Sequence, residues 1–364
     1  DRGIPTGANG RPVEALEDVV FGDPKVNTTE LEAHLWRAAL QHTFSNTLKL
    51  NVSAFYGDYD KLYQNFYASG YDQEAAPDEV TLDGYVDTTQ RKNTILSVNI
   101  VKEARLGNVG HTILSGVESI STSSDQDRYN TFWDTTQDDN ETFSISRNLG
   151  IRGGVGVNVL GLITTNDFGV DVNDHTEVEI DVTSFYIQDE MELSEAFRLV
   201  AGLRYDSFDI NVLNRVAEDS RSSKDSEVSP RFGVVYKPQE NISIYASYSE
   251  SFLPRSGEQF ANINGNNDKL APNTFSNREV GFKYDFASGL SLTAAAFEIE
   301  QRSPQVADND PATLDVIESE IEGFEIQVQG KVTEIWSVSA AYSALDGEQV
   351  ERSGTTGRKP RELP

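Results

Sequence analysis

The stretch FRLVAGLRY, residues 197–205, shows the pattern that decides the fold. Its apolar residues alternate with arginines and small residues, the apolar set being Phe197, Leu199, Ala201, Leu203 and Tyr205. Successive side chains of a β-strand point to opposite faces of its sheet, so this run predicts a strand with one apolar face. Similar alternation recurs at residues 48–56, 232–236, 242–248, 280–286, 324–328 and 336–342. With weaker runs, the chain predicts about twelve strands of ~9–11 residues each. Only residues 30–42 have a pattern that can be argued as a helix.

The connections between these runs alternate in length. Tight turns are expected at residues 45–47, 107–110, 194–196, 238–241, 287–289 and 332–334. Long polar segments, expected as loops, lie between them at about 57–93, 122–178, 211–226, 253–273, 303–314 and 347–360. This alternation indicates an up-and-down antiparallel sheet whose long loops all lie at one end.

The polar second face of each strand indicates which kind of barrel the sheet forms. A small soluble barrel fills its interior with apolar side chains, whereas a transmembrane barrel is apolar outside and polar inside. Aromatic residues near the ends of the runs fit interfacial girdles: Phe44, Tyr56, Tyr205, Phe208, Tyr236, Phe252, Phe286 and Trp336. The sequence therefore predicts an all-β, antiparallel transmembrane β-barrel, and the alternative is a soluble antiparallel adhesin or solenoid.

Composition excludes several classes of function. The 364 residues include 30 Lys and Arg against 59 Asp and Glu, and a formal net charge of −29 argues against a nucleic-acid partner. The chain has no cysteine, which excludes disulfides and thiolate sites. Its four histidines have no zinc-binding spacing, and no spacing supports a catalytic triad. Nothing in the sequence favours an enzyme.

Two of the expected loops are rich in aromatic residues. The first carries Tyr59, Tyr63, Phe66, Tyr67 and Tyr71, and the second carries Tyr129, Phe132 and Trp133. Exposed aromatic rings with polar neighbours suit a planar, partly apolar ligand. Arg128 and Arg255 would supply positive charge in otherwise acidic surroundings. The alternative is that these rings pack one loop against another.

Several longer motifs resemble a known family. They are DRGIPTG at residue 1, SFYIQDEMEL at 184, LVAGLRYDSFDI at 199, NREVGFKYDF at 277, IEGFEIQVQG at 321 and, from residue 230, PRFGVVYKPQENISIYASYSESFLPRSGEQFANINGNNDKLAP. Together they resemble the barrel domain of TonB-dependent siderophore receptors, and YASYSESFLP is the most specific of them. VGHTILSGVES at residue 109 and SGEQFANING at residue 256 look most like the ferric-catecholate branch.

The resemblance implies a domain organisation. Barrels of this family have 22 strands closed around an N-terminal plug. Residues 1–364 would then be a partial barrel domain, an internal block at about strands 5–16. The plug, the first strands and the last strands would be missing, and such a block is not expected to close or to function alone.

The resemblance also implies a function, namely an outer-membrane receptor of a Gram-negative bacterium for TonB-dependent uptake of a ferric siderophore. A catecholate ligand is favoured over a hydroxamate. Iron would be held by the siderophore, so no protein cofactor, protein–metal bond or catalytic residue is expected. Expected partners are the TonB–ExbB–ExbD complex through the missing plug, membrane lipid and lipopolysaccharide, with a monomeric receptor. The expected ligand contacts are Tyr63, Phe66, Tyr67, Arg128, Tyr129, Trp133 and Arg255.

Other functions remain open at this point. The receptor could take haem, cobalamin or a glycan instead, and His175 is the candidate histidine for haem. A passive porin-like channel would share the alternating strands but lack a plug. A soluble adhesin or phage-binding module would be secreted without forming a membrane barrel.

Overall fold

The computed structural model describes residues 5–8, 10–17, 19, 21, 27–131, 133, 136, 138–145, 172–253, 271–306, 314–352 and 361–362. These residues form one sheet of fourteen strands and a short 3-10 turn, η1 (Glu14–Leu16). The strands are β1 (Thr28–Ser45), β2 (Leu48–Gly70), β3 (Glu79–Leu106), β4 (Val109–Asn130), β5 (Glu141–Ser144), β6 (Val172–Glu192), β7 (Phe197–Asn214), β8 (Asp219–Gln239), β9 (Ile242–Leu253), β10 (Asn273–Asp285), β11 (Leu290–Val306), β12 (Leu314–Thr333), β13 (Trp336–Arg352) and β14 (Arg361–Glu362). No helix formed by the described residues is long and apolar enough to cross a membrane.

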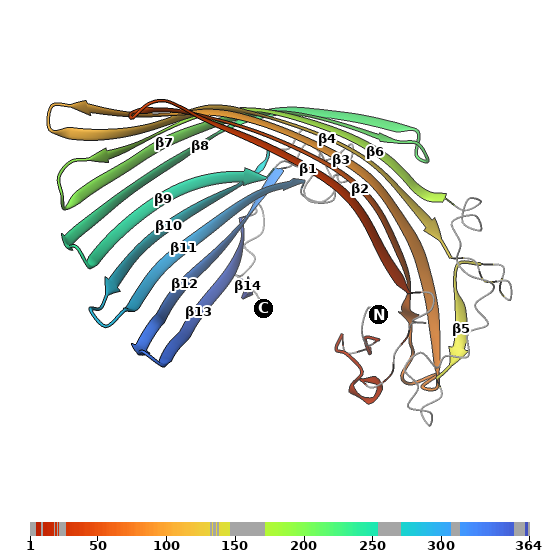
Figure 1. Ribbon diagram of the computed structural model, residues 1–364. Helices are drawn as coiled ribbons and strands as arrows, with labels where there is room; N and C mark the ends of the chain where they lie inside the picture. The colour runs from red at the N-terminus through yellow and green to blue at the C-terminus, as the bar shows by residue number, and fades with distance from the viewer. Residues whose placement is uncertain are drawn as a thin grey trace.

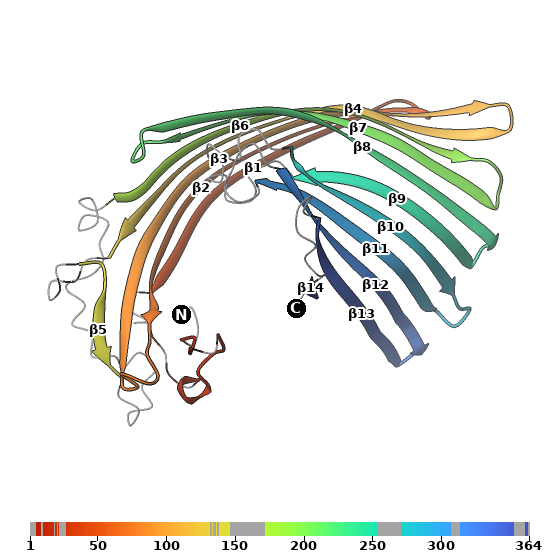
Figure 2. The ribbon, with the colours of Figure 1, turned by 180° about the vertical axis from the view of Figure 1, so that it is seen from behind.

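The strands follow one another across the sheet in chain order, and every pairing is antiparallel. The one exception to the order is β5, which pairs with β3 beside the main path. The sheet curves into an arch (Figures 1 and 2). Twelve of the fourteen strands contain at least 12 residues, which confirms the prediction of an all-β sheet with about twelve main strands. All six predicted tight turns are present between strands.

One face of the sheet carries a continuous apolar belt. Directly paired residues share a face, and one row of them runs across seven strands: Leu40, Val52, Val98, Val117, Phe185, Tyr205 and Val228. Phe185 and Val228 are each 53% exposed. Such a row is unfavourable in water and favourable against hydrocarbon, so this outer face is the lipid-facing wall of a barrel.

The opposite, lumen face is polar and internally bonded. Arg204 is at the centre of its best-connected group. The guanidinium donates to Glu118 at 2.8 Å, to the Ser184 hydroxyl at 2.7 Å and to Asp206 at 2.9 Å. Asp206 is only 4% exposed, so a paired arginine is what allows its carboxylate to be buried.

The helix predicted for residues 30–42 is wrong, because β1 covers this whole segment. Every residue from Thr28 to Thr43 pairs with β2. Trp36, Ala38 and Leu40 lie opposite Tyr56, Ala54 and Val52 and extend the apolar belt. The backbone hydrogen bonds between β1 and β2, together with the burial of Trp36, Ala38 and Leu40 in lipid, outweigh a weak local preference for helix.

The long loops predicted at 57–93 and 211–226 are also wrong, because strands continue through them. The other four predicted loops lie largely outside the described residues. β2 and β3 leave only residues 71–78 unpaired at their outer end, and β7 and β8 leave only 215–218. These extensions rise beyond the apolar belt, and the apolar row of the outer face ends there while the backbone pairing continues. On β6 and β7 the apolar residues change to the lumen face, where they form a second buried cluster of Val178, Ile180, Phe208, Ile210 and Val212.

A small apolar core lies at the outer end of the sheet. Its buried members are Val13, Leu16, Phe21, Val80, Leu82, Trp133 and Ile145, with Phe143 and Tyr71 packed against them. This core fixes η1 and its neighbours against β3 and β5, where Figure 1 shows them together.

Candidate ligand-binding site

Three strands bring aromatic and charged side chains together on the lumen face near the outer end. Tyr63 and Tyr67 lie on β2, Tyr85 on β3 and Arg128 on β4. The register places Tyr63 opposite Asp87, and Asp87 opposite Arg128. Because alternate residues share a face, all of these side chains project from the same side of the sheet as Arg204 and Asn99.

Tyr85 is the centre of the group. Its ring centroid lies 5.9 Å from that of Tyr63 and 6.0 Å from that of Tyr67, and the second pair is edge-on. The guanidinium carbon of Arg128 lies 4.4 Å from the Tyr85 centroid. Tyr85 is 7% exposed, so its ring supports the more exposed neighbours and offers little surface of its own.

Arg128 is held by a bidentate pair of hydrogen bonds to Asp87. Its Nε and Nη2 atoms donate to the two carboxylate oxygens of Asp87, each at 2.7 Å. This bond is the main cause that raises the pKa of Arg128 above its usual range. The Arg128 side chain nevertheless remains 46% exposed, so an arriving ligand can reach the guanidinium.

The charge around the group is mixed. Tyr67 donates its hydroxyl to Asp83 at 3.0 Å, and Asp174 lies opposite Arg128 on β6. The Lys61 ammonium lies 5.9 Å from the Tyr63 centroid. The group can therefore offer aromatic surface and hydrogen-bond donors, with one exposed guanidinium beside acidic neighbours.

Trp133 lies in the small outer core and not on the surface of the group. Its side chain is 2% exposed, its indole N–H donates to the Asp139 carbonyl oxygen at 3.0 Å, and its ring packs edge-on against Phe143 at 5.2 Å. Such a buried ring cannot stack on a ligand, so we leave Trp133 out of the contact set. For Trp133, the alternative stated in the sequence analysis, in which the ring packs one segment against another, agrees better with the structure.

The other expected contacts are not joined to the group. Tyr129 lies beside Arg128 on β4 and therefore on the outer face, where burial raises the pKa of its phenol. Phe66 pairs through its backbone with Gly84, and its side chain lies outside the described set. Arg255 also lies outside the described residues.

Sequence reasoning missed Tyr85 and Asp87. Both fall within a segment that was expected to be a loop, where no face can be assigned. The signal that could have found them is the alternation Asp83, Tyr85, Asp87 at period two.

The model of the family described as "TonB dependent receptor-like, beta-barrel" matches residues 3–364. The chain belongs to the TonB-dependent receptor family. Barrels of this family lie in the outer membrane of Gram-negative bacteria, and the apolar belt is the surface of this receptor that meets lipid.

Curated relatives carry siderophore-receptor names. A probable TonB-dependent siderophore receptor, PiuA of Acinetobacter baumannii, is 26% identical over 94% of this chain and 47% of its own length. The ferrioxamine B receptor of Salmonella typhimurium is 31% identical over 45% of this chain and 23% of its own. The chain spans about half the length of the first of these relatives.

Solved structures show the same fold. The crystal structure of PiuA superposes with a TM-score of 0.77 at 23% identity, covering 99% of this receptor chain and 54% of PiuA. The ferric-catecholate import receptor Fiu of E. coli gives a TM-score of 0.71 at 18% identity, over 92% of this chain and 49% of Fiu.

Proposed function

We propose that this receptor takes up a ferric siderophore across the outer membrane, and that Tyr63, Tyr67 and Arg128, supported by Tyr85, contact the ligand. The observation that carries the proposal is the grouping of these four side chains on the lumen face at the outer end of the sheet. The siderophore-receptor names of the relatives support the same ligand class.

The chemistry of the group favours a catecholate ligand over a hydroxamate. Catechol rings are planar and can pack against the two half-buried tyrosines, Tyr63 and Tyr67, while Arg128 offsets negative charge on the iron complex. The siderophore supplies all iron ligands, so the protein contributes contact surface and no cofactor. Entry would then follow the polar lumen face, with energy from the TonB–ExbB–ExbD complex.

The test uses the complete gene product purified in detergent and radioactive-iron complexes of a tris-catecholate, a monocatecholate and a hydroxamate. We expect saturable binding of a catecholate complex. Tyr63→Ala and Arg128→Gln should each weaken it at least tenfold, which corresponds to about 1.4 kcal/mol. Heat-modifiable migration on a gel checks that each variant is folded.

Tyr129→Ala is the matched control, because it removes a tyrosine next to Arg128 but from the outer face. Its affinity should equal that of the wild type. Binding of the hydroxamate alone would replace the catecholate assignment. A folded receptor that binds none of the three complexes would overturn the siderophore proposal.

A further inference from the structure

An asparagine lies at the centre of the tyrosine group that Tyr63, Tyr67 and Tyr85 form on the lumen face. Asn65 is two residues from each of the β2 tyrosines, and the register places it directly opposite Tyr85 on β3. Residues two apart on a strand and residues directly opposite are the nearest neighbours on one face of a sheet. The three aromatic rings therefore surround the Asn65 amide.

The Asn65 side chain is buried, and half of its amide has no partner. The residue is 2% exposed. Its Oδ1 atom accepts a hydrogen bond from Asn27 Nδ2 at 2.9 Å. Its own Nδ2 atom is buried and donates to none of the described residues. Folded proteins rarely bury a donor without a partner, because its lost hydration is not replaced, and a ligand atom can supply the missing acceptor.

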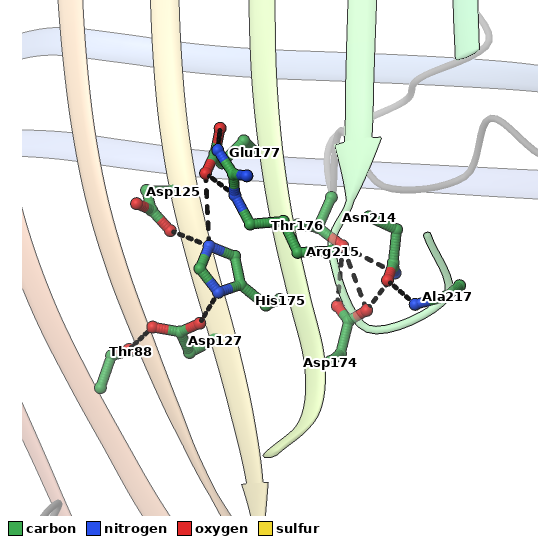
Figure 3. Close-up of polar contacts among 10 residues, drawn as sticks. All are labelled: Thr88, Asp125, Asp127, Asp174, His175, Thr176, Glu177, Asn214, Arg215 and Ala217. Carbon is green, nitrogen blue, oxygen red and sulfur yellow. Dashed lines mark hydrogen bonds and ion pairs between the residues drawn. The ribbon is translucent and has the colours of Figure 1, made fainter. Parts of the chain in front are cut away.

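Three other buried side-chain atoms of the described residues also lack a hydrogen-bond partner, namely His175 Nε2, Asp189 Oδ1 and Asn277 Oδ1. His175 lies on the outer face among acidic side chains (Figure 3), with carboxylate oxygens 3.3, 3.4 and 3.6 Å from its ring nitrogens. Asp189 is also on the outer face, where its other oxygen contacts His111 at 2.7 Å. Asn277 lies on β10. Of these four atoms, only Asn65 Nδ2 belongs to the tyrosine group.

Arg128 supplies a second donor group beside the same rings. Its guanidinium carbon lies 4.4 Å from the Tyr85 centroid, and its side chain is 46% exposed. Asn65 lies on the β2 side of Tyr85 and Arg128 on its β4 side. The site therefore has an exposed charged donor at its rim and a buried neutral donor at its floor, with aromatic rings between them. A planar ring with acceptor oxygens on its edge matches this arrangement.

The buried donor becomes accessible when one of the surrounding rings turns aside. Tyr67 is held by the hydrogen bond of its hydroxyl to Asp83 at 3.0 Å. No described residue is hydrogen-bonded to the Tyr63 hydroxyl, and the Tyr63 ring contacts Tyr85 and Lys61, each at 5.9 Å. A half-buried ring with only such contacts can change rotamer readily. Tyr63 is therefore the ring whose movement admits a ligand oxygen to Asn65.

We propose that Asn65 is a further ligand contact of this receptor, whose Nδ2 donates to an oxygen on the edge of a planar ring beside Tyr85. The inference rests on the proposed function, because it places the ligand in the same site. It restricts the ligand to an aryl group with an edge oxygen, as in a ferric catecholate. A hydroxamate has acceptor oxygens but no ring. The donor that lacks a partner in the free receptor gains one in the complex, which favours the bound state.

The test measures binding of a radioactive ferric tris-catecholate complex to the complete gene product in detergent. Asn65→Leu keeps the branched shape of the side chain and removes the amide. We expect about ten- to a hundredfold weaker binding, as for a lost hydrogen bond to an anionic oxygen. Asn65→Asp keeps an acceptor for Asn27 and replaces Nδ2 by an oxygen, so it should weaken binding at least as much. Heat-modifiable migration on a gel checks that both variants are folded.

A stability measurement separates a ligand contact from a structural role. The midpoint of urea unfolding of Asn65→Leu should be no lower than that of the wild type, because the variant loses a donor that had no partner. Asn27 is half-buried, so water can replace the bond that it loses. An asparagine with a purely structural role would lose stability and affinity together, and that result would overturn the proposal.

Asn51→Leu is the matched control. Asn51 is on the same strand and face, but both halves of its amide are bonded, since its Oδ1 accepts from Gln41 at 3.1 Å and its Nδ2 donates to Asn99 at 2.8 Å. This variant should lose stability and keep the wild-type affinity. Equal affinities of the wild type and Asn65→Leu would overturn this inference alone. A folded wild type that binds no siderophore complex would overturn the proposed function as well.

Discussion

The ring of Tyr186 lies across Gly116, its direct partner on the next strand of the lumen face. A Cβ at Gly116 would stand 2.5 Å from the Tyr186 hydroxyl oxygen and 2.8 Å from the Asn99 Cβ. Tyr245 lies across Gly281 in the same way. The absence of a side chain at these glycines lets aromatic rings lie flat along the lumen wall.

Gly116→Ala should therefore destabilise the receptor. The added methyl has no space between the Tyr186 ring and Asn99, and overpacking of this kind costs about 1–3 kcal/mol. The measurement is the midpoint of urea unfolding in detergent. Gly233→Ala is the control, because its nearest neighbour would be the Val200 Cβ at an ordinary 3.7 Å. Equal midpoints for the two variants would contradict the expectation.

Arg204→Gln should destabilise the lumen wall. It leaves the buried Asp206 carboxylate without its cationic partner, so that the only bond left to it in this group is the one donated by the Ser184 hydroxyl at 2.5 Å. The expected loss of unfolding free energy is about 2–4 kcal/mol, and adding Asp206→Asn should restore part of it. Arg231→Gln serves as control, because its one described side-chain bond is a 3.4 Å contact with Gln188. A double variant no more stable than Arg204→Gln would contradict this account.

Trp133→Ala should loosen the outer end of the receptor and leave the membrane-spanning wall intact. Truncation of a buried tryptophan to alanine leaves a cavity and lowers the free energy of unfolding by about 3–5 kcal/mol. Hydrogen exchange should accelerate at β5 and around η1, both packed on this core. Trp336→Ala, which removes a 62% exposed ring, should change neither region. Unchanged exchange in Trp133→Ala would show that the core does not hold these segments.

Asp87→Asn should strengthen the binding of an anionic ferric catecholate. The substitution removes a negative charge and frees the exposed guanidinium of Arg128 from its carboxylate partner. An exposed pair of this kind is worth about 0.2–1 kcal/mol, so the gain in affinity should be a few-fold and should shrink in high salt. Asp58→Asn, on the outer face of β2, should have no effect. Weaker binding in Asp87→Asn would mean that Asp87 acts by positioning Arg128.

Much of the fold could be predicted because a strand that crosses a membrane has an apolar residue at every second position, on the face that meets lipid. Residues such as Phe185 and Val117 alternate with polar neighbours wherever the wall crosses the membrane. The outer face loses its apolar residues beyond the membrane, although the hydrogen-bonded ladder continues, and on β6 and β7 apolar residues reappear on the lumen face. The outer extensions around Tyr63 and Asp219 therefore looked like loops. At residues 30–42, partner strands decided the structure, and a local pattern contains no information about partners.

The site was predictable in part. Composition alone selected Tyr63, Tyr67 and Arg128, and the structure brings these three around Tyr85. It could not separate Arg128 from Tyr129, because neighbouring residues go to opposite faces only once a strand is known. The contacts of His175 with Asp125 and Asp127 could not be predicted, since strand register brings these residues together across about fifty residues of sequence.

The long outer extensions of the strands have a consequence for access. From Val228 in the apolar belt, β8 continues for nine residues to Asp219, which is about 30 Å at ~3.3 Å per residue. At β7 and β8 the described edge of the sheet therefore extends well beyond the apolar belt. Along β7 and β8 the described rim is a continuous hydrogen-bonded wall, closed by the turn at residues 215–218. This part of the rim therefore has a fixed position, which limits the size of what can pass beside it.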